Sequence, residues 1–477
     1  MKTKTVFKMN MVMACTALAL TGMAHSAYAA EEEAVAEYTF LDAIKDGKQM
    51  TNFRLRYENV NQEAFSSGSK LKTGEAFTLR SLIGWQTAPY KNFSIGAQIT
   101  DVHEFNDDFN DRRNNLSEHS NGGAAGAGLN KAQYPNIVDP GFTDINQLYV
   151  DWTGIKNTKV RLGRQQLNLD NVRFIGDIAF RQNMQVFDGV SVLNKSIQDV
   201  ELFAAHFDKV RQITTKDRHG NIDIVNAKYR ISPSESLVGY GYLIDVANLG
   251  QNNGNPAAIG TAAQGGNGLG ASQDTTKSAT TDASSKTFGA RLDGVRAVNP
   301  DWKVLYTAEY AKQTDMSGGS PLIDAHYFKL GGGAAYGAWS VRIDHEKLSS
   351  NDGQYAFQTP LGTNHLFQGW ADHFLATPRQ GMEDTFVTVA GAIDKVKLYA
   401  EYHVFKSDVK YQSTGGRLGD KYGSEFDISA TYPFSDKVLG KVEYANFNES
   451  DIYGTTLQNA ARKGDKEIIW VTGMYTF

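Results

Sequence analysis

Charged side chains recur at alternate positions along much of this chain, and their types and spacing suggest a shared chemistry. Arg54 and Arg56 flank Leu55, so both guanidinium groups would lie on one face of an extended segment. Guanidinium groups bind carboxylate and phosphate oxygens, and rows of opposite charge can also pair with each other to stabilise a wall. The sequence leaves both interpretations open for any one residue. The arginines in this pattern are Arg54, Arg56, Arg80, Arg161, Arg230, Arg291 and Arg342, and the opposing acids are Glu58, Asp151, Asp293, Glu309, Glu401, Asp427 and Glu443.

Motifs for catalysis are absent from the sequence. It contains no G-x-S-x-G nucleophile elbow, no P-loop and no H-E-x-x-H zinc motif, so we predict no catalytic residue and no cofactor. His365 and His373 share a predicted loop, where packing is favoured over metal binding. Asp107, Asp108 and Asp111 lie in an Asn-rich loop and could hold Ca²⁺ through oxygen ligands, although simple solvation is favoured there.

The elements that would position the charges are short strands. Apolar and polar residues alternate with a period of two, which places successive side chains on opposite faces of a strand. About 18 such segments follow one another, an even number, as single-chain outer-membrane barrels require. The predicted strands lie near 52–59, 76–86, 92–102, 145–153, 158–165, 184–193, 198–207, 222–231, 237–245, 286–294, 302–311, 325–333, 338–347, 384–392, 395–405, 422–432, 437–446 and 468–477.

Short and long connections alternate between these strands. Short turns such as 232–235 and 433–436 carry Pro, Ser and Asp, which favour tight turns. The long connections lie near 103–144, 246–285, 348–383 and 447–467. This asymmetry predicts an all-β transmembrane antiparallel barrel with short periplasmic turns and long extracellular loops. Apolar and charged residues fall out of phase between residues 160 and 194, where we expect β-bulges.

Both ends of the chain fit an exported barrel. Residues 1–29 have a basic start, an apolar stretch and small side chains at Ala27 and Ala29, which predict a cleaved secretory signal peptide. The only cysteine, Cys15, would leave with the signal, and a lipoprotein interpretation is disfavoured because the apolar stretch continues past it. The last strand puts Val471, Tyr475 and Phe477 on one face, as expected for an outer-membrane strand that ends in an aromatic residue. We therefore predict a signal peptide over 1–29, a periplasmic segment over 30–49 and a barrel over 50–477.

Composition excludes several other classes of protein. The mean hydropathy is −0.41, and no stretch after residue 30 reaches about 18 consecutive apolar residues, the length that a membrane-spanning helix needs. Loss of the three signal lysines changes the net charge from −5 to −8, which argues against nucleic-acid binding. An aqueous lumen reconciles this polarity with a membrane barrel, because only alternate residues then need to be apolar. The polar face of the strands would then face the lumen, and we predict that these residues line the pore: Arg54, Arg56, Arg80, Arg161, Arg230, Arg291, Arg342 and Glu401.

Several motifs resemble the alginate-export family of outer-membrane porins. They include Leu162-Gly-Arg-Gln165, Leu169-Asp-Asn-Val-Arg-Phe174, Phe357-Gln-Thr-Pro-Leu-Gly-Thr-Asn-His365 and Gly369-Trp-Ala-Asp-His-Phe-Leu-Ala-Thr-Pro378. The resemblance implies an 18-stranded barrel that passes a polyuronate or another small solute without energy input. It also implies loops folded into the lumen and pore-lining arginines. Arg164, Arg173 and Arg181 occupy matching motif positions and are the candidates for a constriction.

These observations predict a passive outer-membrane channel for small polar solutes, anionic or saccharide-like. Expected partners are outer-membrane lipid, lipopolysaccharide, the barrel-assembly machinery and the permeant, with no nucleic acid. Two alternatives remain open, a receptor or adhesin that acts through its loops and a membrane-embedded hydrolase with Ser and His on its outer wall.

Overall fold

The computed structural model describes residues 37–63, 71–111, 131, 133–246, 249, 282–412, 416–452 and 464–477. The predicted signal peptide and Cys15 lie outside these residues. No helix in the described part of the chain is long and apolar enough to cross a membrane.

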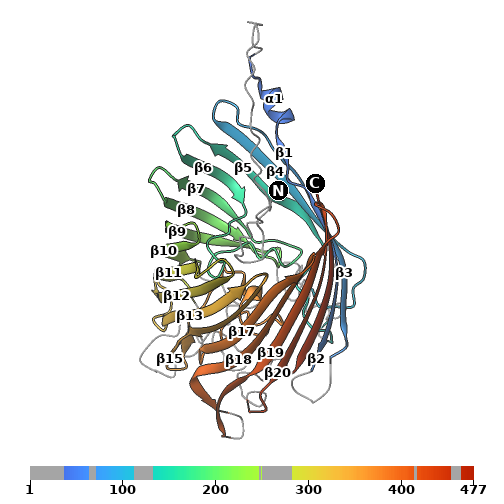
Figure 1. The fold of residues 1–477 in the computed structure, drawn as a ribbon, viewed down its shortest axis with the longest axis vertical. Helices are drawn as coiled ribbons and strands as arrows, with labels where there is room; N and C mark the ends of the chain where they lie inside the picture. The colour runs from blue at the N-terminus through green and yellow to red at the C-terminus, as the bar shows by residue number, and fades with distance from the viewer. Residues whose placement is uncertain are drawn as a thin grey trace, which may run out of the picture.

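Eighteen antiparallel strands form one closed barrel, because the last strand, β21, pairs with β20 on one side and with the first barrel strand, β2, on the other (Figure 1). A two-residue strand, β1 (Lys48–Gln49), adds to the edge of β3, and β15 (Ser350–Asn351) pairs with β16 (Tyr355–Ala356) in a separate small hairpin. The barrel strands are β2 (Asn52–Gln62), β3 (Gly74–Gln86), β4 (Phe93–Glu104), β5 (Phe142–Trp152), β6 (Thr158–Gln165), β7 (Val186–Asn194), β8 (Val200–Arg211), β9 (Asp217–Ser232), β10 (Glu235–Asp245), β11 (Ser285–Ala297), β12 (Trp302–Asp315), β13 (Asp324–Tyr336), β14 (Trp339–Leu348), β17 (Met382–Ile393), β18 (Val396–Gln412), β19 (Leu418–Pro433), β20 (Val438–Glu449) and β21 (Lys466–Thr476).

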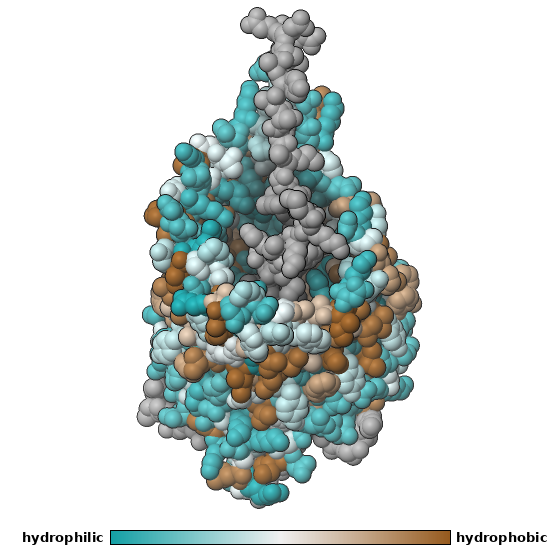
Figure 2. Space-filling model, in the orientation of Figure 1, coloured by the Kyte–Doolittle hydropathy of each residue, from teal (hydrophilic) through white to brown (hydrophobic). Residues whose placement is uncertain are grey.

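The two faces of the wall differ in chemistry because side chains alternate along each strand. In β2 the polar Arg54, Arg56 and Glu58 are buried toward the interior, whereas Leu55 is exposed on the outer wall. Figure 2 shows the outer apolar side chains gathered in a belt across the middle of the visible face, with hydrophilic zones on either side. An apolar belt of this kind matches the hydrocarbon layer of a bilayer.

Aromatic residues mark the end of the barrel where the short turns lie. Trp302, Tyr336, Trp339, Phe434 and Phe477 are all exposed there. The rings of Trp302 and Tyr336 pack against each other across neighbouring strands, with centroids 4.9 Å apart. Such a girdle is expected where strands leave the lipid at an interface.

A short helix, α1 (Phe40–Lys45), stands at the same end of the barrel as the chain's C-terminus (Figure 1). Thr39 and Asp42 cap it reciprocally, because the Thr39 hydroxyl accepts from the Asp42 backbone N–H and the Asp42 carboxylate accepts from the Thr39 N–H. The Trp85 indole donates to the Ile44 carbonyl at 2.8 Å and holds the helix end against the wall.

The predicted strands are confirmed, and most of them extend further than the sequence pattern indicated. The expected irregularity between 160 and 194 appears as a bulge between Asp188 and Gly189 in the pairing of β7 with β8. Some connections at the long-loop end are short; residues 212–216, for example, join β8 to β9. Loop length therefore alternates less strictly than predicted.

Candidate functional site: a lumen crossed by two inner loops

Two loops fold into the barrel and meet inside it. We call residues 166–185, between β6 and β7, inner loop A, and residues 357–381, before β17, inner loop B. Their backbones contact each other directly, because the Gly176 N–H donates to the Leu361 carbonyl and the Thr363 N–H donates to the Val172 carbonyl, each at 2.9 Å. The Gln185 side chain adds a hydrogen bond to the Leu361 carbonyl at 3.0 Å. The two loops thus form one layer within the lumen.

Arg173 anchors inner loop A to the far wall. Its side chain is 0% exposed, and its Nε donates to Glu346 of β14 at 2.9 Å. The strand before loop A, β6, lies eight places from β14 in the ring of eighteen, so inner loop A reaches across the lumen to make this ion pair. Burial acts to lower the pKa of Arg173, but Glu346 outweighs it and raises that pKa, so the guanidinium stays charged. Thr359, Asn364 and Gln368 of inner loop B accept its remaining N–H groups.

Arg181 joins both loops to the near wall. Its guanidinium lies 3.0 Å from Glu58 of β2 and 2.7 Å from Asp372 of inner loop B. Burial alone would lower the pKa of Arg181, but Glu58, Asp139 and Asp372 together hold it above its ordinary value. Arg173 and Arg181, both predicted at a constriction, are therefore brought into the layer of loops, as buried and fully paired cations.

Arg54, Arg56 and Arg80 lie behind inner loop A. Arg54 donates to the Ala179 carbonyl at 2.7 Å, Arg56 donates to the Phe180 carbonyl at 2.6 Å, and all three side chains are buried. The Arg56 guanidinium also stacks over the Phe180 ring at 4.4 Å. These arginines are on the luminal face, as predicted, but they bind the loop and have little exposure to water.

Arg164 is not in this group. It pairs in register with Leu148 on the outer face of the wall, and its Nε and Nη2 donate to the two carboxylate oxygens of Asp188, at 2.7 and 2.9 Å. Arg161, three residues earlier on the same strand, has the opposite orientation and stacks on the luminal Tyr149 at 3.5 Å while binding Asp151. The expected grouping of Arg164 with Arg173 and Arg181 is therefore wrong, because the two-residue period of β6 turns Arg164 outward.

The other predicted residues are distributed along the luminal wall. Arg291 pairs with Asp293, and Arg342 binds Asp344 through two hydrogen bonds of 2.7 Å. Arg230 is exposed, on the same face of β9 as the buried Asn226, and so is its neighbour Lys228. Among the described residues, no ion pair joins Lys228 or Arg230 to an acid. Glu401 is buried on β18 beside His403.

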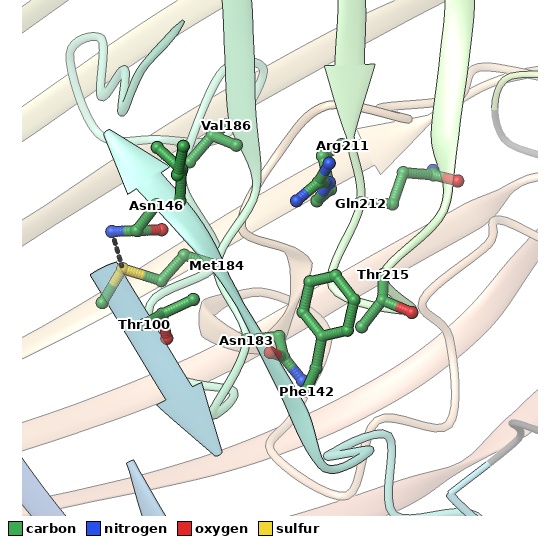
Figure 3. A pocket seen from close by; sticks show the side chains of 10 residues that line it. Thr100, Phe142, Asn146, Asn183, Met184, Val186, Arg211, Gln212 and Thr215 are labelled. Atoms are coloured by element: carbon green, nitrogen blue, oxygen red, sulfur yellow. Dashed lines mark hydrogen bonds between the residues drawn. The ribbon is translucent and has the colours of Figure 1, made fainter. Parts of the chain in front are cut away.

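A small pocket lies where the end of inner loop A meets the wall (Figure 3). Asn183, Met184 and Val186 line it together with Asn146 and Arg211, and the Asn146 amide contacts the Met184 sulfur at 3.8 Å. Only about 10 Å³ is open to a water-sized sphere, which is room for about one water molecule. This pocket is too small to be the path of a permeant.

The side chains that the sequence offered as metal ligands in two predicted loops contact other groups of the protein. His365 stacks on Phe180 with centroids 3.3 Å apart and binds Asp372 at 2.9 Å, and His373 stacks on Phe447 at 4.0 Å. Asp108 accepts from the Tyr134 hydroxyl at 3.1 Å. One group in the described part of the chain has the spacing of metal ligands, and it consists of Glu401, His403 and Asp427. The calcium loop stays a prediction.

The partners of the loop arginines are the functional residues that sequence reasoning missed. Glu346 lies 173 residues from Arg173, and Asp372 lies 191 residues from Arg181. Glu346 is a polar residue of a predicted strand, and Asp372 lies in a predicted loop. No local sequence pattern pairs either acid with a distant arginine. A signal was present for Asp372, which lies in the run from Gly369 to Pro378.

A closed 18-stranded antiparallel barrel with an apolar outer belt, a charged lumen and loops folded inside it defines an outer-membrane porin. The chain belongs to the Campylobacter major outer membrane protein family, whose family model matches residues 7–254. The protein is accordingly located in the bacterial outer membrane. This porin family differs from the alginate-export family that the motifs of the two inner loops resemble.

Solved porin structures share the fold at low sequence identity. Pseudomonas aeruginosa OpdQ is 12% identical with a TM-score of 0.61, over 92% of this chain and 99% of that chain. Acinetobacter baumannii OccAB4 is 10% identical with a TM-score of 0.61, over 89% and 97%. Pseudomonas aeruginosa OpdK with vanillate is 12% identical with a TM-score of 0.58, over 91% and 98%. No curated protein sequence matches the chain.

Proposed function

We propose that this porin is a passive diffusion channel for small polar solutes and that it favours anions. The observation that supports this most is the layer formed by the two inner loops, which lies across the lumen and is fixed to β14 by Arg173 and to β2 by Arg181. A fixed layer in an otherwise wide barrel restricts passage to small solutes and sets their route along charged walls.

The preference for anions rests on which luminal charges remain open to water. Asp344 is buried against Arg342, and Glu443 is buried against Lys441. Lys228 and Arg230, by contrast, are exposed on the luminal face near the short-turn end of β9. Buried and paired charges contribute little field to the lumen, whereas exposed cations raise the local concentration of anions. The net charge of the whole chain does not decide selectivity.

One motif resemblance and one solved structure suggest which anions to test. The alginate-export resemblance of the inner-loop motifs suggests a uronate or a short polyuronate. The crystal structure of OpdK is that of the porin with vanillate, an aromatic carboxylate. Both are carboxylates, so we propose that class of permeant. We also propose contact with lipid and lipopolysaccharide, insertion by the barrel-assembly machinery, and export directed by residues 1–29, which are then removed.

Planar-bilayer recordings of the purified protein test this function. We expect ion conductance without an energy source and a reversal potential, in a salt gradient, that favours anions. The double variant Lys228→Gln/Arg230→Gln should shift the reversal potential toward cations. Lys286→Gln, which removes a cation from the outer face of β11, is the matched control and should leave it unchanged.

Each unfavourable result of these recordings contradicts a different part of the proposal. Absence of conductance would contradict a channel and favour an embedded enzyme or a loop-acting receptor. Conductance with unchanged selectivity in the double variant would contradict the role of Lys228 and Arg230. Liposome uptake of monocarboxylates, uronates and neutral sugars would then rank the permeants.

A further inference from the structure

The luminal wall beneath inner loop B carries a dense group of ionisable side chains on three adjacent strands. Asp384 is on β17, Glu401 and His403 are on β18, and Glu425 and Asp427 are on β19. Every one of these side chains is buried. The group contains four carboxyl groups and one imidazole, so a positive charge is needed there unless protons neutralise the acids.

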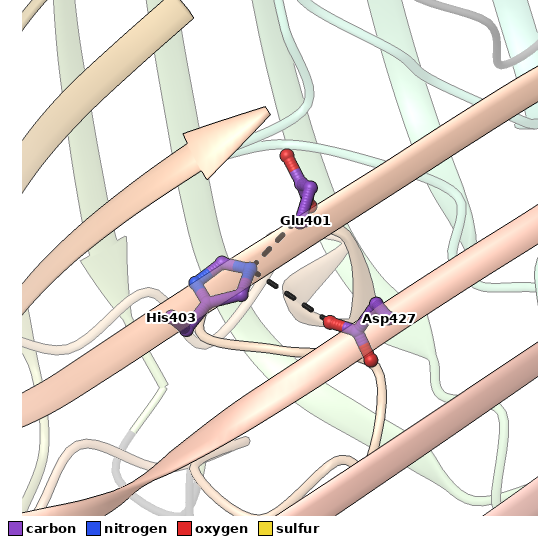
Figure 4. A group of neighbouring side chains, drawn as sticks. All are labelled: Glu401, His403 and Asp427. Carbon is purple, nitrogen blue, oxygen red and sulfur yellow. Dashed lines mark ion pairs between the residues drawn. The ribbon is translucent and has the colours of Figure 1, made fainter. Parts of the chain in front are cut away.

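The imidazole of His403 is oriented toward two of the acids (Figure 4). Its Nδ1 binds both carboxylate oxygens of Asp384, at 2.9 and 3.1 Å. Asp384 thereby holds the Nδ1–H tautomer and leaves the Nε2 lone pair facing the other way. Nε2 is buried and makes no hydrogen bond among the described residues. It lies 3.4 Å from Glu401 Oε2 and 3.7 Å from Asp427 Oδ2.

Other contacts orient both facing acids. The Thr388 hydroxyl donates to Glu401 Oε1 at 2.8 Å, and the Tyr399 hydroxyl donates to the same oxygen, so that Oε2 is left toward His403. The backbone N–H of Trp370 in inner loop B lies 3.4 Å from Asp427 Oδ2. The other oxygen of Asp427 and Oε2 of Glu425 have no hydrogen-bond partner in the described part of the chain.

We propose that Glu401, His403 and Asp427 bind a divalent transition-metal ion of the zinc class. A tetrahedral Zn²⁺ with ligands at about 2.0–2.2 Å spaces those ligands about 3.3–3.6 Å apart, close to the two nitrogen–oxygen separations at Nε2. A carboxylate bound to the distal nitrogen of a metal-binding histidine is the usual second partner in such sites, and Asp384 has that position. Glu425 or water would supply the fourth ligand.

The site would also fasten inner loop B to the wall. The Ala371 N–H donates to Glu425 Oε1 at 2.6 Å, and Gly369 leaves space for that carboxylate, because an added Cβ would lie 2.4 Å from it. A metal ion bound by Asp427 and Glu425 would therefore stabilise the same two acids that hold the loop backbone. This role is independent of which solute the channel passes.

Metal binding to the full-length protein in detergent tests the proposal. After treatment with EDTA and dialysis, the protein is titrated with Zn²⁺ by calorimetry, and its metal content is measured. We expect one equivalent of Zn²⁺ bound, and a visible absorption spectrum of tetrahedral Co²⁺ when Co²⁺ replaces it. His403→Gln should abolish both signals, and Asp384→Asn should weaken Zn²⁺ binding by about 10–100-fold.

His206→Gln is the matched control, because His206 also binds a carboxylate, Asp223 at 2.7 Å, but is half exposed and lacks the other two acids. Heat-shift gels confirm that each variant is folded, and Asp384→Asn carries the test if His403→Gln does not assemble. Absence of binding in the wild type would overturn the proposal and leave protons as the neutralising charge. Equal binding in the wild type and His403→Gln would overturn it as well.

Discussion

Arg173 shows how a residue in a predicted loop comes to determine the shape of the lumen. It is fully buried, and Glu346 and three side chains of inner loop B occupy its N–H groups. A buried cation without its partner is far less stable than the pair, because neither group can recover its hydration. Arg173 therefore holds inner loop A against the wall, and Glu346 neutralises its charge.

Replacement of Arg173 with Met should destabilise the loop layer, because Glu346 would remain buried without its counter-charge. The expected cost is about 3–5 kcal/mol, and we expect larger and noisier single-channel currents as inner loop A leaves the far wall. Denaturant unfolding in detergent and bilayer recordings measure the two effects. Arg296→Met is the control, since its pair with Glu235 is 70% exposed on the arginine side and should change little. If Arg173→Met shows wild-type currents, Arg173 does not hold inner loop A against the wall.

Asp372 should make the loop layer sensitive to acid. Burial raises the pKa of its carboxyl, but His365 and Arg181 outweigh burial and hold that pKa below its ordinary value. The folded state thus favours the ionised form. Its contribution to stability is complete above the ordinary carboxyl pKa of about 3.9 and is lost as the pH falls further.

The thermal stability of the wild type should therefore fall as the pH decreases below about 4. Asp372→Asn should be less stable at neutral pH and should show a shallower acid dependence. Melting curves from heat-shift gels across this range measure both. Asp107→Asn, in which an exposed acid is replaced, should follow the wild type. If the melting temperatures of Asp372→Asn and the wild type fall in parallel as the pH decreases, Asp372 does not cause the acid sensitivity.

At the scale of elements, the alternation of apolar and polar residues predicted the barrel strands, because the two faces of a strand are set by its local sequence. Residues such as Leu55 and Val471 lie on the outer face because lipid requires apolar side chains at every second position, and the sequence carries that period through most of the strands, with an interruption between residues 160 and 194. The inner loops have no period. Their positions depend on pairs such as Arg181 with Asp372, which the chain separates by 191 residues, so the family resemblance indicated inward loops but the sequence did not indicate their contacts.

Replacement of residues 170–182 by a short Gly-Ser linker should enlarge the conductance, because it removes most of inner loop A from the lumen. It should also strengthen the preference for anions, since Arg54, Arg56 and Arg80 would then face water. The same linker inserted in the turn 434–437, at the short-turn end of the wall, should change neither property. If the conductance of the loop variant stays at the wild-type value, inner loop A does not narrow the route of the permeant through the lumen.

At the scale of the whole molecule, stability depends on closure of one seam. β21 pairs with β20 and β2 along its full length, and the Phe477 N–H donates to the Thr51 carbonyl at 3.3 Å. The Phe477 ring contacts Phe53 across the seam, with centroids 6.0 Å apart. An open seam would leave backbone groups unpaired in lipid, each at a cost of several kcal/mol. The terminal aromatic residue, the strongest sequence indication of a barrel, thus lies at the point where the barrel closes.

Deletion of Phe477 should lower the amount of barrel assembled in the outer membrane while export and signal cleavage continue, because the closing strand would lose its interfacial anchor. Phe477→Ala should act in the same direction but more mildly. Outer-membrane fractionation with heat-shift gels at matched expression measures the assembled fraction, and circular dichroism in detergent should remain β-dominated in the material that assembles. Phe434→Ala is the control, since this aromatic is also exposed at the same rim but packs on Tyr432 in a turn away from the seam. Normal assembly of the deletion variant would mean that strand pairing alone closes the barrel.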